Sequence, residues 1–538
     1  MLALGQLPPL APVASVDYQS NGRLLVIADS APRLAQAIEG LAEQLDVAVL
    51  WTGGAPVPVI AESEIVAGKL VRLSGHLGGF ELVFESQTAA VAQMAPFDLV
   101  LDLVASPVFR MHQPPQGYFH AVDGAALARA LAELPEMIGE FEKPKFFAYK
   151  ESICAHSRSK KAGCNKCIDI CSTVAISSAG DTVKVDPHLC MGCGACATVC
   201  PSGALSYQYP LVADRGAQLK ASLNAYRLAA KGQGPAPVIL FHNATDGRDA
   251  LVALASTGKG LPTNMLPLET WHVASIGLDV LFGALAYGAG HVAVLAAGSE
   301  APQYIDALET EMELGETILH ALGFVGRHFS VVQRGDGGAF DALQTLLPGE
   351  TVSIPAGFNL SGDKRTSLEF AVEHFARHAK EAPAQITLPS GSLFGALNID
   401  RQKCTMCMAC AGACPASALM DGGDIPQLKF LERNCVQCGL CANTCPEDAI
   451  SLLPRLLLGD KRKTAVVLNE AEPFDCISCG KPIGTKQMVD NMIGKLAGHS
   501  MFQGEGKLKR LQMCADCRVV DMMSNKQEYS ILTGKVPG

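Results

Sequence analysis

The sequence lacks an excess of basic residues and a high density of charge. Its 538 residues include 43 lysines and arginines against 53 aspartates and glutamates, for a formal net charge of -10. Because nucleic acids are polyanions, an acidic chain without a basic patch is not expected to bind them. Charged residues make up 18% of the chain and apolar residues 49%, which argues against disorder. The length predicts about three or four packed domains.

The N-terminal sequence lacks the features of a secretion signal. The stretch MLALGQLPPLAPVASVDYQSNGR has no positive n-region, no twin arginine and no A-x-A site after an apolar core. We therefore expect a cytoplasmic protein rather than a secreted protein with disulfides. In a reducing compartment, clustered cysteines indicate metal binding or redox chemistry.

Motifs for nucleotide binding and ester hydrolysis are also missing. No G-x-G-x-x-G follows a predicted strand, and neither G-x-x-x-x-G-K-[ST] nor G-x-S-x-G occurs. One apolar stretch, residues 277–298, is long enough to suggest a membrane span. Asp279, His291 and two internal glycines favour a helix over 277–289 that leads into a buried strand over 291–297. We expect no membrane span, while peripheral membrane association and the oligomeric state stay open.

Two long parts of the chain contain no cysteine. In residues 1–150, short apolar runs such as GRLLVIAD and DVAVLWTGG alternate with helical patterns, and residues 213–385 show the same alternation. This alternation is typical of α/β domains with a largely parallel sheet. The linkers KGQGPAP and KEAPAQITLPSGS, rich in proline, glycine and small residues, bracket the second cysteine-free part.

The twenty cysteines fall in three segments, and the first two segments repeat one pattern. HLCMGCGACATVCPSGALS (188–206), KCTMCMACAGACPASALM (403–420) and NCVQCGLCANTCPEDAIS (434–451) share their cysteine spacing and a proline. Zinc usually takes two C-x-x-C pairs separated by a longer loop, whereas here a third cysteine follows at once. Three closely spaced thiolates can hold three corners of a 4Fe–4S cluster, while the fourth reaches a neighbouring cluster.

These motifs resemble the bacterial-type dicluster ferredoxins, in two copies. For the copy at 386–460, the resemblance implies one cluster on Cys404, Cys407, Cys410 and Cys445, and its partner on Cys435, Cys438, Cys441 and Cys414.

The copy at 151–212 departs from the pattern of that family. Nine residues separate Cys154 from Cys164, and Ser172 replaces the proline expected after Cys171. The resemblance implies one cluster on Cys154, Cys164, Cys167 and Cys200, and another on Cys190, Cys193, Cys196 and Cys171. If Cys154 does not bind, its site would hold a three-iron or a labile cluster.

The last four cysteines form two C-x-x-C pairs, Cys476 with Cys479 and Cys514 with Cys517. Two such pairs predict a closed tetrahedral site, so we expect structural zinc in a zinc-ribbon-like segment. A mononuclear iron or a fifth cluster is the alternative. The predicted fold is therefore α/β and multidomain: α/β domains at 1–150 and 213–385 alternate with ferredoxin-like α+β modules at 151–212 and 386–460, followed by the C-terminal segment at 461–538.

Two wider resemblances bear on function. The middle domain resembles the delta subunit of hydrogenases that feed heterodisulfide reductases, through the stretch from LPLETWHV to HVAVLAAG, but lacks that family's cysteines. This implies partner docking or a scaffold role, without a cluster. The whole chain resembles multi-cluster ferredoxin proteins that accompany molybdenum- or tungsten-dependent formate dehydrogenases, which implies a redox protein as partner.

The patterns favour an electron carrier with four 4Fe–4S clusters and no catalytic residue of its own. Two alternatives stay open: a maturation or scaffold factor for a molybdoenzyme, and a reductase with an unrecognised cofactor site in the α/β domains.

Overall fold

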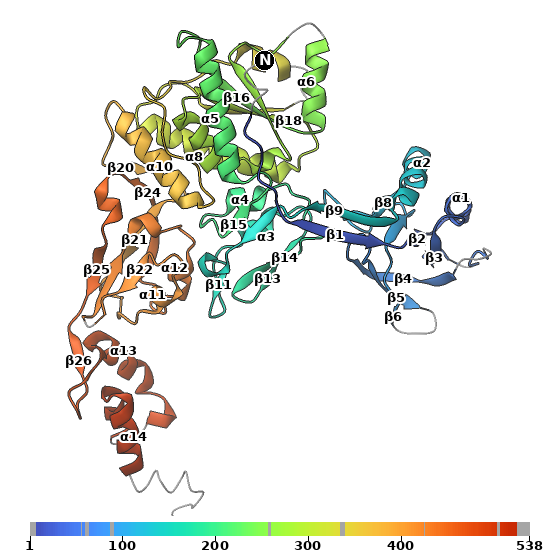
Figure 1. Ribbon diagram of the computed structural model, residues 1–538. Coiled ribbons are helices and arrows are strands. Elements are labelled where there is room, and N and C mark those ends of the chain that lie inside the picture. The colour runs from blue at the N-terminus through green and yellow to red at the C-terminus, as the bar shows by residue number, and fades with distance from the viewer. Residues whose placement is uncertain are drawn as a thin grey trace, which may run out of the picture.

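The computed structural model describes residues 7–54, 56–59, 64–86, 91–256, 260–333, 339–423, 425–502 and 506–524. The predicted mixed α/β class is confirmed. We call residues 1–150 the N-terminal domain, 151–212 the first module, 213–385 the middle domain, 386–460 the second module and 461–538 the C-terminal segment. Residues 525–538 of that last segment lie outside the described residues. In Figure 1 the middle domain lies above the two modules and the N-terminal domain lies to the right of the first module. The C-terminal segment lies below the second module.

The N-terminal domain contains a seven-stranded sheet in the order β6-β5-β4-β3-β2-β7-β8. Strands β4, β3, β2, β7 and β8 pair in parallel, and β5 and β6 add an antiparallel edge. The strands are β2 (Arg23–Ala28), β3 (Asp46–Trp51), β4 (Glu64–Ser74), β5 (Glu81–Ser86), β6 (Ala92–Gln93), β7 (Leu99–Asp102) and β8 (Tyr118–His120). Helices α1 (Ala31–Leu41) and α2 (Gly124–Glu133) share one buried cluster with β2 and β3.

A separate ribbon connects this domain to the first module. Strands β1 (Ser15–Ser20) and β9 (Gly139–Pro144) pair antiparallel along their whole length. The hydroxyl of Tyr18 on β1 donates to the carbonyl of His188 at 2.7 Å, so the ribbon reaches a cysteine-bearing loop.

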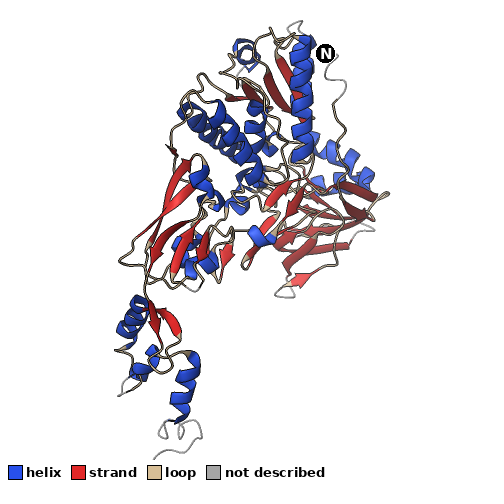
Figure 2. Ribbon diagram, turned by 60° about the vertical axis from the view of Figure 1, so that its left-hand side comes forward, coloured by secondary structure: helices blue, strands red, loops and turns tan. Residues whose placement is uncertain are grey.

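The middle domain is built on a four-stranded sheet in the order β17-β16-β18-β19, with every neighbouring pair parallel. Its strands are β16 (Val238–Asn243), β17 (Met265–Thr270), β18 (His291–Ala296) and β19 (Phe329–Gln333). Its helices are α5 (Val212–Ala229), α6 (Asp246–Ser256), α7 (Leu278–Ala286), α8 (Pro302–Ala321), α9 (Ala339–Thr345) and α10 (Lys364–His378). Figure 1 labels α5, α6, α8 and α10, and Figure 2 shows the helices of the molecule in blue. The apolar stretch at 277–298 is buried helix α7 followed by strand β18. Within the described residues no helix is both long and apolar enough to span a membrane.

The two modules are made of short strands and one-turn helices. The first contains β11 (Ser157–Arg158), β12 (Lys161–Ala162), α3 (Lys166–Ile170), β13 (Ile176–Ala179), β14 (Thr182–Val185), α4 (Ala195–Val199) and β15 (Leu205–Tyr207). Strand β10 (Phe147–Tyr149), at the end of the N-terminal domain, pairs with β15. The second contains β20 (Gln385–Thr387), β21 (Gly395–Ile399), α11 (Ala409–Ala413), β22 (Leu419–Asp421), β23 (Gln427–Phe430), α12 (Leu440–Thr444) and β24 (Ile450–Leu457).

The C-terminal segment begins with β25 (Val466–Glu470), which pairs with β23 of the second module. Beyond it come β26 (Pro473–Asp475), β27 (Pro482–Thr485), α13 (Lys486–Leu496) and α14 (Ala515–Ser524). Strands β26 and β27 form a hairpin, and the first C-x-x-C pair lies in its turn.

Candidate metal centres

Four cavities in the two modules are each lined by four cysteines. Each set of four is one of the quartets implied by the ferredoxin resemblance, and we name them in spatial order. Site A has Cys171, Cys190, Cys193 and Cys196; site B has Cys154, Cys164, Cys167 and Cys200; site C has Cys414, Cys435, Cys438 and Cys441; site D has Cys404, Cys407, Cys410 and Cys445. The space free of protein atoms is about 460, 330, 360 and 360 Å³ respectively. None of the twenty cysteines, all of which lie within the described residues, forms a disulfide.

The backbone around these cysteines turns its N–H groups toward sulfur. The amide of Ala418 donates to Cys414 Sγ at 3.2 Å, and that of Ala449 donates to Cys445 Sγ at 3.3 Å. Gly194 and Gly439 have φ near +80°, a conformation that glycine adopts without strain, and each precedes a short helix. N–H groups directed at sulfur stabilise negative charge there, so this donor set suits an anionic iron–sulfur cluster.

Cys154 lines the same cavity as the other three cysteines of site B, despite its unusual spacing. Tyr149 lines the same cavity, and its pKa is raised mainly by burial and also by Cys154. His156 fills the wall beside it, with Nε2 at 2.7 Å from the Ser178 hydroxyl. The structure thus brings all four predicted ligands of this site together.

Two of these thiols show how burial affects them. Burial, followed by smaller effects that include repulsion from neighbouring thiols, raises the pKa of Cys190 to about 11 and that of Cys410 to about 12. Without a counter-charge these two cysteines therefore stay neutral at pH 7. A thiophilic cation would displace these protons, so metal binding is coupled to proton release.

Cysteines of adjacent sites affect the pKa of one another, and these effects give the order of the sites. Besides burial, which is the main cause, Cys167 of site B raises the pKa of Cys196 of site A. Cys410 of site D has the same effect on Cys441 of site C. The two modules interact in turn, because Cys164 of site B raises the pKa of Cys438 of site C. Such interactions fall off with distance, so the order along the molecule is A, B, C, D.

The loop that follows Cys154 makes a close contact between the modules. This loop forms the hairpin of β11 and β12. Asn443 on α12 donates to the Ala162 carbonyl at 2.8 Å. A side chain on Gly163 would lie 2.4 Å from Leu440 Cδ1 and 2.3 Å from the Ala155 carbonyl, so the loop and α12 are in close contact.

The first residues of α10 bind both modules. Lys364 is 7% exposed, and its Nζ donates to the carbonyls of Ala197 and Thr198 in the first module. Arg365 donates through Nη2 to the carbonyls of Arg433 and Cys435 in the second module, at 3.1 and 3.2 Å. Two consecutive cations of the middle domain therefore hold the modules side by side. Sequence reasoning missed both residues, since no local pattern marks them.

The four C-terminal cysteines also meet. Their sulfur atoms all lie within 4.8 Å of one another, and Cys479 Sγ is 3.7 Å from Cys514 Sγ. Burial raises the pKa of Cys476, but N–H groups of Cys514, Cys479 and Ser478 outweigh it and bring the pKa to about 6. This arrangement could bind one metal ion. Thr485 of the same segment donates to the Thr405 carbonyl of the site D loop at 3.0 Å, so the segment contacts that loop.

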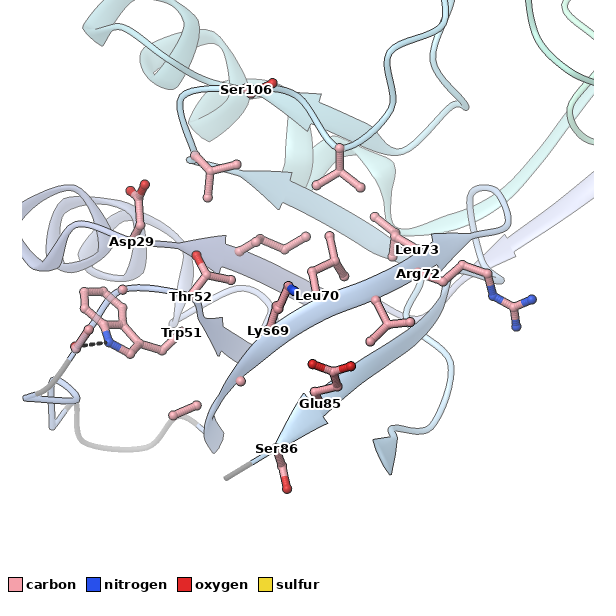
Figure 3. Close-up of a pocket in the computed structure, with 18 of the residues that line it drawn as sticks. Asp29, Trp51, Thr52, Lys69, Leu70, Arg72, Leu73, Glu85, Ser86 and Ser106 are labelled. Atoms are coloured by element: carbon pink, nitrogen blue, oxygen red, sulfur yellow. Dashed lines mark hydrogen bonds between the residues drawn. The ribbon is translucent and has the colours of Figure 1, made fainter. Parts of the chain in front are cut away.

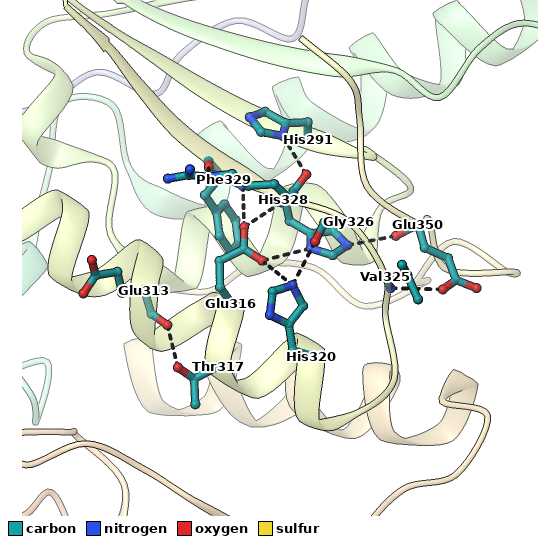
Figure 4. A network of polar contacts seen from close by, with 11 residues as sticks. His291, Glu313, Glu316, Thr317, His320, Val325, Gly326, His328, Phe329 and Glu350 are labelled. Atoms are coloured by element: carbon teal, nitrogen blue, oxygen red, sulfur yellow. Dashed lines mark hydrogen bonds and ion pairs between the residues drawn. The ribbon is translucent and has the colours of Figure 1, made fainter.

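A carboxylate and two histidines form a further cluster at the end of α8 (Figure 4). Oε1 of Glu316 accepts from the backbone N–H groups of both His328 and Phe329, at 2.6 and 2.9 Å. His320 Nε2 lies 2.8 Å from the Gly326 carbonyl, and His328 Nε2 lies 3.2 Å from the Glu350 carbonyl. Because these atoms already serve in hydrogen bonds that join α8 to β19, the cluster is a structural network.

A larger open cavity lies on the N-terminal domain (Figure 3). It has about 1950 Å³ free of protein atoms and opens at the carboxyl ends of β2 and β3, beside Asp29 and Thr52. The sheet order reverses at β2, since β3 lies on one side of it and β7 on the other. Trp51, Lys69 and apolar side chains of β4 also line this cavity.

Two parts of the chain match known families of iron–sulfur domains. Residues 183–206 match a 4Fe-4S binding domain, and residues 396–446 match a 4Fe-4S dicluster domain. "Hydrogenase-4 component A" of Escherichia coli (strain K12) is 45% identical over 40 residues, which are 7% of this chain and 20% of that protein. "Ferredoxin 7Fe" of Hydrogenibacillus schlegelii is 36% identical over 42 residues, 8% and 54% of the two chains.

The chain therefore spans about a fifth and about half of the lengths of these two relatives. Both family matches fall inside the segments where cysteine spacing predicts clusters. The prediction of dicluster ferredoxin modules is confirmed: this chain carries ferredoxin-type 4Fe-4S domains.

Proposed function

We propose that this protein is an electron-transfer protein with four 4Fe–4S clusters, held at sites A, B, C and D by the sixteen cysteines named above. One observation carries the proposal: each predicted quartet lines its own cavity, and the quartets follow one another in an unbroken series. A thiolate-bound cluster accepts and returns one electron without making or breaking bonds. The chain's part is to hold the sulfurs, exclude water and direct N–H donors at them.

Metal and sulfide content tests this proposal directly. Anaerobically purified protein is expected to contain roughly sixteen irons and a similar amount of acid-labile sulfide. Electron paramagnetic resonance of the reduced protein should show interacting clusters, because the sites lie in series. About eight irons would mean that one module binds no cluster, and the relay would then be contradicted.

The partner that we propose is a redox enzyme of the formate dehydrogenase kind, in the cytoplasm. The support is the resemblance to proteins that accompany such enzymes, together with a relative named as a hydrogenase component. Reduction of the purified protein by a formate dehydrogenase and formate, followed as bleaching of the cluster absorbance, tests this partner. A protein that a low-potential dye reduces but the enzyme does not would contradict it.

For the C-terminal segment we propose one structural zinc ion on Cys476, Cys479, Cys514 and Cys517, in a zinc-ribbon-like fold. The four converging sulfurs and the N–H donors around Cys476 support it, since a closed set of four thiolates is usual for structural zinc. Zinc analysis should give about one ion per chain, and none in a Cys476→Ser variant. Iron in its place would contradict zinc.

A second candidate function, a reductase with an organic cofactor, is favoured by the open cavity of the N-terminal domain. Ligands of open α/β sheets bind beyond the carboxyl ends of the strands, where the strand order reverses, and this cavity lies there. A flavin spectrum in the purified protein would favour the reductase over the simple carrier.

A further inference from the structure

Site A is the site at which side chains from both cysteine-free domains meet the first module. Tyr304, on the first turn of α8 in the middle domain, is 1% exposed and packs against Ala195 and Cys193. Lys143, on β9 of the N-terminal domain, is 9% exposed. Neither residue lies near a cysteine in the sequence.

The Tyr304 side chain contacts both Ser172 and Cys193. The backbone N–H of Ser172 donates to the Tyr304 hydroxyl oxygen at 3.3 Å, and the Ser172 hydroxyl is in hydrogen-bond contact with the same oxygen. Cys193 packs against the buried cluster that contains Tyr304, and the tyrosine lowers the pKa of that thiol against the larger, opposite effect of burial.

When Cys193 is a thiolate, the available protons determine which groups donate and which accept around the Tyr304 hydroxyl. A thiolate has no proton to give, so in a hydrogen bond between the two groups the Tyr304 O–H is the donor to sulfur. The two lone pairs of the Tyr304 oxygen then accept from the N–H and the O–H of Ser172. A proline at position 172, as the ferredoxin pattern expects, would remove both of these donors. Ser172, unlike proline, can therefore donate two hydrogen bonds to the Tyr304 oxygen.

Lys143 adds a cation on another side of site A. Its Nζ donates to the carbonyls of His188 and Cys190, at 2.7 and 2.8 Å, and lies 5.0 Å from the centre of the Tyr18 ring. These bonds fix the ammonium group beside the loop that carries three of the four cysteines of site A.

We propose that Tyr304 and Lys143 raise the reduction potential of the cluster at site A, and that each cysteine-free domain thereby helps to set that potential. The inference rests on the proposed function. Reduction adds one negative charge to the cluster, and a hydrogen bond to a ligand sulfur or a nearby cation stabilises the reduced form more than the oxidised form.

The test is a redox titration of the full chain, followed by electron paramagnetic resonance. Tyr304→Phe removes only the hydroxyl and is expected to move one midpoint potential to a more negative value. Lys143→Met should move the same midpoint in the same direction. Ser172→Ala, which keeps its N–H, should give a smaller shift than Tyr304→Phe.

Tyr207→Phe is the matched control. Tyr207 is buried in the same module, but its hydroxyl donates to the Gly192 carbonyl at 2.8 Å and not to sulfur. It is expected to leave every midpoint unchanged. An equal shift in Tyr207→Phe, shifts of different signals in Tyr304→Phe and Lys143→Met, or no shift in either would overturn the inference. The proposed function fails separately, if the wild-type chain binds no clusters.

Discussion

The two modules hold their cysteines in the same way, yet the second follows the regular ferredoxin spacing and the first does not. In the second module, Met408 and Gly439 adopt left-handed backbone conformations before α11 and α12. The first module has this turn at Gly194 before α4, but its α3 begins after Asn165 with φ of −113°.

Each irregular feature of the first module coincides with a contact to another part of the molecule. The long loop after Cys154 forms the hairpin that leads to Gly163, which packs against Leu440 of the second module. Ser172, in place of proline, bonds to Tyr304 of the middle domain. The comparison teaches that departures from a ligand motif can mark inter-domain contacts rather than a damaged site.

The largest effect is expected from removing a cysteine of the regular module. Cys438→Ser should lose the cluster of site C, lower the iron content by about four and destabilise the second module, because metal binding is part of folding such a segment. Cys154→Ser should be milder, because Cys154 lies outside the regular spacing and a three-iron cluster can remain on Cys164, Cys167 and Cys200. Iron analysis and thermal unfolding measure both, and equal losses would remove the distinction between the modules.

The next largest effect is expected at the start of α10. Arg365→Met removes charged hydrogen bonds to carbonyls of the second module, two of them part-buried, and should cost about 1.5–3 kcal/mol for each part-buried bond. Lys364→Met should do the same for the first module. Arg401→Met is the control, because the Arg401 side chain donates to the Leu468 carbonyl in an exposed position. Denaturant unfolding of the three variants measures the difference, and an equal loss in the control would refute the anchoring role.

A smaller effect is expected from Gly163→Ala, which adds one methyl group where the two modules are in contact. The new Cβ of Gly163→Ala would lie 2.4 Å from the buried Leu440, so overpacking should cost about 1–3 kcal/mol and weaken the magnetic interaction between sites B and C. In Gly412→Ala the methyl group meets nothing within 4 Å, and a helical alanine should stabilise by about 0.5–1 kcal/mol. Identical behaviour of the two variants would argue against the contact.

The smallest effect is expected away from the cysteines, at Glu316 in the middle domain. Burial raises the pKa of Glu316, but hydrogen bonds from His328 and Phe329 outweigh it, so the pKa lies below its ordinary value. Its stabilisation is therefore present above the unfolded pKa of about 4.3 and lost as pH falls through the lower folded pKa. Thermal unfolding should show a Glu316→Gln variant less stable than wild type at pH 7, with the gap narrowing in acid. A constant gap would contradict this assignment.

Much of the site could be predicted from the sequence, because three ligands of each of sites A, C and D lie on one short loop and their spacing is therefore local. The alternation of strands and helices likewise indicated the α/β class. Lys143, Tyr304 and Arg365 could not be found in this way, since each reaches its site from a distant part of the chain. Ser172, where the ferredoxin pattern expects proline, was a sign in the sequence of the contact with the middle domain. Only the structure identifies Tyr304 as the residue that it contacts.

The enclosure of site A also has a consequence for biosynthesis. Its cysteines are complete once Cys196 has left the ribosome, yet Tyr304 is made long afterwards, and Trp271, whose Nε1 donates to the Met191 carbonyl at 3.2 Å, also follows. The nascent chain therefore presents an uncovered site A for as long as these residues are missing. During that interval a cluster can enter site A without displacing Tyr304 or Trp271. Site D, in contrast, keeps an exposed cysteine, Cys407, in the folded protein.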